Sequence, residues 1–351
     1  MKRFIALSLI LALVAGGAFA QTTIDDFKAV FTDFTDSFAS TLMLNSTIGN
    51  DWSDGYVGGF PHFGVGLVLG STFTGEGTAD PVFNLMGVAV PQELEQLGVP
   101  IPAVALVAKL GLPFLPIDIG VKAGVVTPEM ATALEGAYGV AAAYKNVGAS
   151  IRGRVLKEGV LLPELSLGVA GNYLTGDISS AIPGVTGQDV TYEPGDGSIW
   201  TVSLPAPKVA YAWETKTLDF TAQVSKNILF IRPYLGAGYT IGTSTVAGGL
   251  ASDTPTASEG TTTVYDYDGD GDLDGQEDLD DLIYLAETSG ASGVPDFSAT
   301  GFLYSPLPVT DPGFRVYAGV SVSILVTLDL QLMYVPATEA LGASISARLQ
   351  L

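Results

Sequence analysis

The chain has 351 residues, a formal net charge of −22 and a positive mean hydropathy of +0.38. Such acidity excludes nucleic acid as an expected partner, because binding phosphates requires a basic surface. The absence of cysteine excludes disulfides and an acylated N-terminal cysteine, and a single histidine excludes a metal site of the His/Cys type. A high net charge and a high mean hydropathy cannot both belong to the same part of the surface. Apolar and acidic segments must therefore be separated in space.

Residues 1–20 have the three parts of a secretory signal peptide. A basic start precedes an apolar stretch over 4–14, and small residues follow at Ala18 and Ala20. The stretch is shorter than the roughly 20 residues that a membrane-spanning helix needs. We therefore expect cleavage after Ala20 and export, with an uncleaved N-terminal anchor as the alternative.

The next segment, 21–50, is predicted to be helical. Over 23–44 the large apolar residues recur every three or four positions, which places them on one helix face; they are Ile24, Phe27, Phe31, Phe34, Phe38 and Leu42. Thr23 can cap this helix, and two aspartates follow in its first turn. It is either a packing helix that covers one end of the remaining fold, which we favour, or a plug inside it.

The remainder, 51–351, is dominated by a period of two. No window of about 20 residues is purely apolar, and only helices and closed barrels satisfy their backbone groups in lipid. At the C-terminus, apolar residues alternate with polar ones over a length typical of a barrel strand; the apolar set is Ala343, Ile345, Ala347, Leu349 and Leu351. We predict an all-β fold, a transmembrane antiparallel β-barrel. A soluble sandwich is the alternative, but its outer face would be more strongly charged.

Alternation predicts the positions of the strands. It is clear at 63–73, 117–125, 138–144, 149–155, 165–173, 218–224, 231–241, 315–323, 326–332 and 341–351, and weaker at 102–112, 199–205 and 207–213. This indicates roughly 12 to 14 strands, with a tight turn near 323–325. The tally itself is odd, whereas single-chain bacterial barrels normally have an even number, so we expect one error, between residues 50 and 115.

The strand phase also predicts which charges face the lumen, because charge on the lipid face is costly. The predicted lumen is of mixed charge with a basic bias, beneath acidic outer loops. Its expected members are Lys122, Arg152, Arg154, Arg232, Arg315, Arg348, Asp118, Asp219 and Asp329.

A long acidic insert, 243–311, interrupts the strands and contains the sequence DYDGDGDLDGQE at 266–277. This spacing resembles the loop of EF-hand calcium-binding proteins at every diagnostic position. The resemblance implies bound calcium held by Asp266, Asp268, Asp270, Asp274 and Glu277, with a backbone carbonyl from Asp272. The residues before the loop are β-like, so we expect a solitary structural site, with a merely solvated acidic loop as the alternative.

The chain as a whole resembles porin-like and fatty-acid-transporter-like barrels of the bacterial outer membrane. That resemblance implies contact with outer-membrane lipid and a channel or uptake route for small solutes, apolar ones included. The second interpretation is a surface-exposed binding or adhesive protein anchored by the barrel; a wide polar lumen would favour the first and a filled lumen the second. A hydrolase that uses His62 is a remote third, so we do not expect an enzyme. Barrel termini normally lie in the periplasm, which places the calcium loop outside the cell.

Overall fold

The fold is a closed antiparallel β-barrel of ten strands, described here from a computed structural model. The structure describes residues 24–57, 63–78, 96–129, 140–181, 186–192, 199–206, 208–251, 301–304 and 313–350, with residues 80, 131, 132, 136, 253, 256–259 and 308–310 between them. The predicted signal peptide, His62 and the predicted calcium loop lie outside these residues.

Six strands have 9 to 12 residues: β1 (Phe63–Phe73), β2 (Pro100–Gly111), β3 (Ile117–Val125), β12 (Gly313–Ser323), β13 (Thr327–Val335) and β14 (Ala340–Gln350). Four are longer, with 17 to 21 residues: β4 (Val140–Leu156), β5 (Glu164–Ala181), β8 (Lys208–Ser225) and β9 (Ile231–Ala251). Each strand pairs with its neighbour in the chain, β9 pairs with β12, and β14 pairs with β1 to close the barrel.

The strand count corrects the expected 12 to 14. The segments 138–144 and 149–155 are one strand, β4, and 207–213 and 218–224 are one strand, β8. The segment 199–205 is not in the barrel: β7 (Trp200–Leu204) lies in a separate sheet with β6 (Gln188–Tyr192) and β10 (Thr256–Glu259). The expected error between residues 50 and 115 was therefore wrongly placed.

The two ends of the barrel differ in their connections. At one end, which we call the short-turn end, the strands are joined by three to seven residues, at 112–116, 157–163, 226–230 and 324–326. At the other, the long-loop end, the connections include 74–99, 126–139, 182–207 and 252–312. The first strand begins and the last strand ends at the short-turn end, because the number of strands is even.

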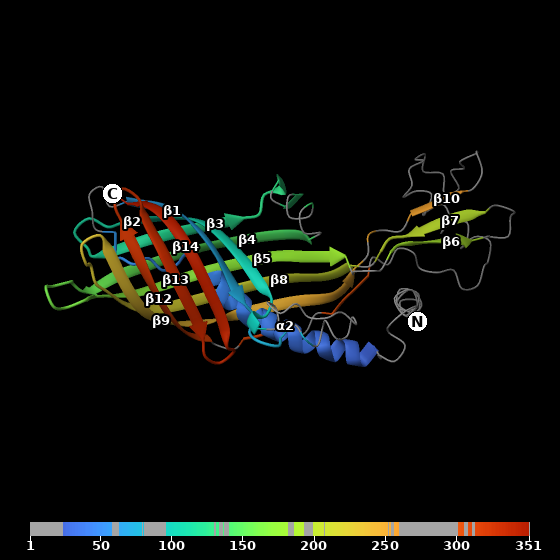
Figure 1. The fold of residues 1–351 in the computed structure, drawn as a ribbon, viewed down its shortest axis with the longest axis horizontal. Coiled ribbons are helices and arrows are strands. Elements are labelled where there is room, and N and C mark those ends of the chain that lie inside the picture. The colour runs from blue at the N-terminus through green and yellow to red at the C-terminus, as the bar shows by residue number, and fades with distance from the viewer. Residues whose placement is uncertain are drawn as a thin grey trace.

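The four long strands continue past the long-loop end. Strand β3 ends at Val125, opposite Lys145, and β12 begins at Gly313, opposite Thr240. Beyond these points β4, β5, β8 and β9 form a curved sheet, which we call the projecting sheet, and the small sheet of β6, β7 and β10 lies past its tip (Figure 1). Strand β11 (Gly301–Tyr304) pairs with the end of β9.

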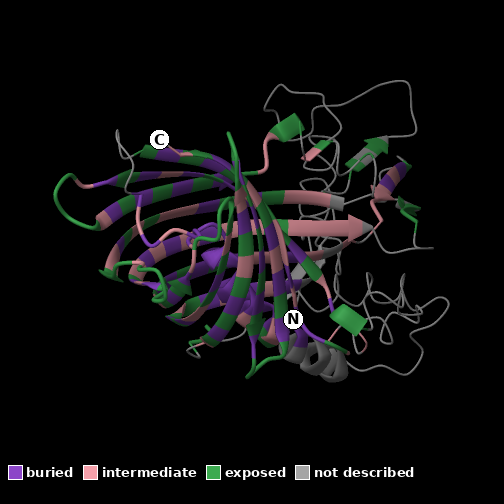
Figure 2. Cartoon of the chain, turned by 60° about the vertical axis from the view of Figure 1, so that its left-hand side comes forward, coloured by how far each residue is buried: buried purple, intermediate pink, exposed green. Residues whose placement is uncertain are grey.

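Exposure alternates along the barrel strands, as the striped ribbons in Figure 2 show. The outward residues are large and apolar, for example Leu67 and Leu69 on β1 and Leu328, Leu330 and Leu332 on β13. Strand β2 is an exception, because its inward residues apart from Lys109 are apolar as well.

The interior is occupied by helix α2 (Ile24–Thr47) and the segment 48–57 that follows it. The helix packs mainly against β9 and β8 and enters the barrel from the long-loop end (Figure 1). Every residue from Thr41 to Asn50 is buried. The structure thus places the C-terminal half of α2 in the lumen, which is the plug alternative rather than the favoured packing helix.

Within the described residues, none of the helices has the length and apolarity required to cross a membrane.

Candidate functional site in the barrel lumen

The lumen site consists of the C-terminal part of α2, the segment 48–57 and the inward side chains of the strands. We call residues 34–57 the plug. The first residues of the plug lie against the projecting sheet, where Phe34 and Phe38 contact Tyr211 and Trp213 of β8. Their ring centroids are 5.1 to 5.8 Å apart. These aromatic contacts hold the entry of the plug by burial of apolar surface.

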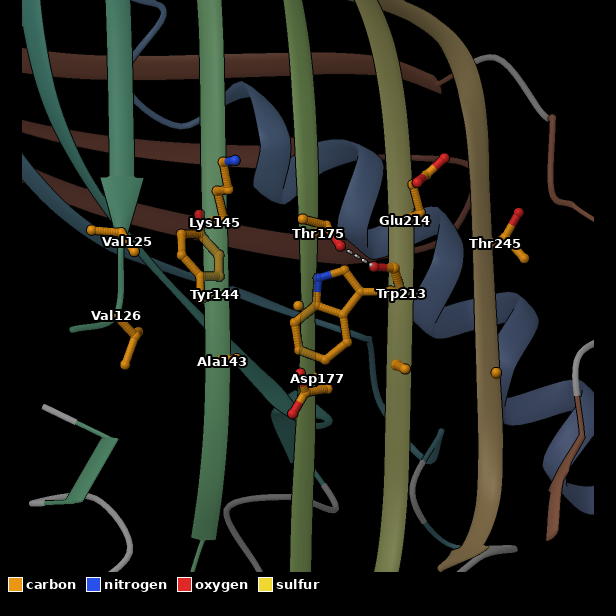
Figure 3. A pocket seen from close by; sticks show the side chains of 13 residues that line it. Val125, Val126, Ala143, Tyr144, Lys145, Thr175, Asp177, Trp213, Glu214 and Thr245 are labelled. Carbon is orange, nitrogen blue, oxygen red and sulfur yellow. Dashed lines mark hydrogen bonds between the residues drawn. The ribbon is translucent and has the colours of Figure 1, made fainter. Parts of the chain in front are cut away.

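A groove of about 560 Å³ lies on the projecting sheet, lined by residues of β3, β4, β5, β8 and β9 that include Trp213 (Figure 3). Small residues at Ala143 and Gly176 shape it: a Cβ on Gly176 would lie 2.8 Å from the Trp213 ring. Thr175 fixes the β8 backbone here by donating to the Trp213 carbonyl at 3.0 Å. The absence of a side chain at 176 thus lets the indole of Trp213 lie across β5 and reach Phe38.

Two buried lysines hold the C-terminal end of α2. Lys122 of β3 donates to the carbonyl oxygens of Ser46 and, at 3.0 Å, of Ile48. Lys109 of β2 donates to the carbonyl of Asn50 at 2.7 Å. The last carbonyls of a helix have no partner within it and carry partial negative charge, so an ammonium group is a favourable cap.

A triad of charges joins the plug to the opposite wall. Arg315 of β12 lies between Asp51 of the plug and Asp219 of β8, at 2.9 and 2.8 Å. All three side chains are at most 5% exposed. Thr240 donates to the second oxygen of Asp219 at 2.8 Å, and Gln331 donates to Asp51 at 3.4 Å. Each charge of this triad therefore has a partner of opposite sign, which offsets the cost of burying it.

The end of the plug is bound by three more arginines. Arg348 of β14 donates to Ser53 at 2.6 Å and to Asp54 at 3.2 Å, and its guanidinium lies 4.9 Å from the centre of the Trp52 ring. Arg232 of β9 also pairs with Asp54, at 2.9 Å. Arg152 of β4 donates to the Trp52 carbonyl at 3.0 Å.

Two carboxylates of the barrel wall accept hydrogen bonds from the last backbone amides of the plug. Arg152 also pairs with Asp118 at 2.7 Å, and Asp118 in turn accepts from the Val57 amide at 2.9 Å. Glu164 of β5 accepts from the amide of Gly55. Near the short-turn end, the barrel wall thus forms hydrogen bonds with both carbonyls and amides of the plug backbone.

All nine charges predicted for the lumen lie on the inner face of the barrel. Lys122, Arg152, Arg232, Arg315 and Arg348 contact the plug directly. Of the other four, Asp118 also bonds a plug amide, Asp219 completes the triad, Asp329 pairs with Arg348 at 3.6 Å, and Arg154 lies 4.6 Å above the ring of Tyr56.

Four charged residues of this site were missed by sequence reasoning. Lys109 lies in β2, whose apolar inner face hides the alternation. Glu164 is the first residue of β5, one position before the predicted start of that strand. Asp51 and Asp54 lie in the irregular segment between helix and barrel, where no periodicity exists to assign a direction.

Comparisons with solved structures give other barrels. The chain is similar to the translocator domain of the autotransporter NalP from Neisseria meningitidis, with a TM-score of 0.32 and 10% identity over 96% of this chain and 100% of that one. It is also similar to the transport unit of the autotransporter AIDA-I from Escherichia coli, with a TM-score of 0.31 and 10% identity over 89% and 98%. A Pseudomonas aeruginosa FadL homologue gives 0.25 and 8% over 82% and 90%.

No protein-family model matches the chain, and no curated protein matches it in sequence. The function proposed next therefore rests on the chain's own geometry.

Proposed function

We propose that this protein is an outer-membrane β-barrel whose lumen is held closed by the plug, and that it anchors and displays the elements at its long-loop end. The observation that carries the proposal is the continuous burial of residues 41–50, combined with wall partners for most of the polar side chains that follow; these are Asn45, Ser46, Asn50, Asp51, Ser53 and Asp54. A loosely fitting plug would leave charges unpaired in the lumen, which is costly.

The displayed part consists of the projecting sheet, the small sheet of β6, β7 and β10, and the insert that carries the predicted calcium loop. A strand tilted in a membrane needs only about 9–11 residues to cross, whereas β9 has 21. The excess lies at the long-loop end. Outer-membrane barrels have short periplasmic turns and longer extracellular loops, so this end faces outward, and calcium outside the cell orders the insert through Asp266 to Glu277.

The plug runs through the lumen from the long-loop end to the short-turn end. Its aromatic entry contacts the projecting sheet, and Val57 at its other end bonds to Asp118 at the start of β3. Because β3 starts at the short-turn end, the chain runs inward through the lumen from the outer side. The start of α2 is therefore displayed outside together with the long loops.

A second candidate is uptake of small solutes through a lumen that the plug vacates. It is favoured by the wall, which would form a polar and predominantly basic channel. The inner-face charges are Lys109, Lys122, Arg152, Arg154, Arg232, Arg315 and Arg348 against Asp118, Glu164, Asp219 and Asp329.

One experiment separates the two candidates. The hydroxyls of Ser46 and Thr217 are 2.8 Å apart, and the chain has no cysteine, so a Ser46→Cys/Thr217→Cys pair can lock the plug to β8 by a disulfide. Reconstituted vesicles loaded with small anions are compared with the lock oxidised and reduced. A sealed anchor leaks in neither state. Leakage that appears on reduction and disappears on oxidation would establish the uptake route and overturn the anchor.

A further inference from the structure

Each of the four short turns carries large apolar side chains that nothing in the described chain covers. Six of these side chains are more than four fifths exposed: Phe114, Val160, Leu161, Leu229, Ile324 and Leu325. Leu115, Leu162, Ile228, Phe230 and Val326 add further exposed apolar surface. We call these residues together the apolar rim.

The rim is not a product of turn chemistry. Turns in water favour Gly, Asn, Asp and Ser, which suit their backbone angles. Here Phe114 and Leu229 stand at φ of 71° and 58°, in the left-handed region that large side chains rarely adopt. Residues of this kind at these positions require another reason, and their side chains have no partner within the described protein.

Several polar groups of the β4–β5 and β8–β9 turns bond to one another. Lys226 donates to the carbonyls of Gly159, Val160 and Leu162 in the neighbouring turn and pairs with Glu158 at 3.3 Å. Glu158 also accepts from the amide of Asn227 at 3.0 Å. With these carbonyls and charges bonded internally, most of the outer surface of the two adjacent turns is left to the apolar side chains, beside the exposed Lys157.

At β13 the rim continues the lipid-facing band without a polar break. On β13 the exposed residues run from Val326 through Leu328 and Leu330 to Leu332. The other end of the band is different, because there the outward positions of β4 and β8 change to Lys145, Glu214 and Lys216. A change from apolar to charged outward strand positions marks where a barrel leaves the membrane, and the described strands show it at the long-loop end; at the short-turn end the exposed polar side chains, Lys157 and Asn227, lie in the turns.

We propose that the short-turn end of the barrel does not project into water but is embedded in the bilayer, with the apolar rim in contact with the lipids of the periplasmic leaflet. This inference rests on the proposed outer-membrane location. Its occupant is lipid because the rim is continuous with the lipid-facing band and because Glu158 and Lys226, of the β4–β5 and β8–β9 turns, are bonded to each other.

The test places a fluorescent reporter at the rim of the full-length protein in phosphatidylcholine vesicles. The Leu325→Trp and Phe114→Trp variants are compared with Thr338→Trp, an exposed turn position at the opposite end. Emission of the wild type, with its three native tryptophans, is subtracted. We expect brominated phospholipids to quench the two rim reporters several-fold more than Thr338→Trp, and aqueous iodide to show the reverse order.

A further reporter keeps this inference separable from the proposed function. Leu69→Trp lies in the lipid-facing band of β1. If lipid quenches Leu69→Trp while iodide quenches both rim reporters, the barrel is in the membrane and the rim is in water, which overturns the inference alone. If lipid quenches none of the three, the outer-membrane proposal itself fails. The Phe114→Trp exchange replaces one exposed aromatic residue by another, so it gives a reading even if Leu325→Trp fails to fold.

Discussion

Replacing Arg315 by methionine should strongly destabilise the barrel. The change keeps an unbranched side chain similar in length to the aliphatic part of arginine and removes the charge that Asp51 and Asp219 share in a site at most 5% exposed. Breaking a buried ion pair by removing one partner costs about 3–5 kcal/mol. Asp219 keeps its bond from Thr240 and Asp51 keeps its bond from Gln331, which favours the lower part of that range. A loss of about 3 kcal/mol corresponds to a roughly hundredfold change in the folding equilibrium.

The measurement is urea-induced unfolding of the protein in vesicles, followed by tryptophan fluorescence. Adding Asp51→Asn to Arg315→Met should restore part of the loss, because one of the two unpaired carboxylates is then neutral. Lys216→Met, which removes an exposed pair with Glu214, is the matched control and should have little effect. If Arg315→Met proves as mild as Lys216→Met, the triad does not hold the plug and the reasoning for a sealed lumen is refuted.

Three further predictions concern the wall, the direction of the plug and the insert. A Cβ on Gly319 would lie 2.4 Å from the ring of Tyr234, so Gly319→Ala should cost about 1–3 kcal/mol in unfolding experiments; Gly171→Ala, where nothing lies within 4 Å, should not, and equal effects would contradict the packing. An epitope tag placed before Ile24 should bind antibody on intact cells, and detection only after lysis would reverse the direction of the plug. Protease should cut the insert on intact cells faster in chelator than in calcium, and Glu277→Ala should abolish the difference; resistance in chelator until lysis would place the insert inside.

The local alternation of the strands could be read from the sequence because it depends only on the chain itself. Successive side chains of a strand point to opposite faces, so a charge on the wrong face of a membrane barrel is penalised at once. This is why residues such as Arg315 and Asp219 could be assigned to the inner face without knowing their partners. The turn near residue 324 was also visible, and the structure has β12 end at Ser323 and β13 begin at Thr327.

The number of strands could not be read correctly, because the pattern changes along the longer strands. On β8 the outward residues are apolar at Leu218 and Phe220, but charged at Glu214 and Lys216. Beyond these charges the inward face becomes apolar, since Tyr211 and Trp213 pack on α2. One continuous strand therefore carries two patterns of opposite phase, and it was counted as two.

The sequence by itself determined the class of fold, the inner face for the nine charges assigned to it and the presence of a long amphipathic helix before the barrel. Only the tertiary structure decided that this helix lies in the lumen and that ten strands suffice to surround it. It also decided that the inner face of β2 is mostly apolar, because Ile101, Ala105 and Val107 cover the plug. The physical reason is the distance along the sequence between the residues that interact. Alternation depends on residues two positions apart, whereas Asp51 and Arg315 are 264 positions apart. No local pattern in the sequence therefore indicates which surface a helix will contact.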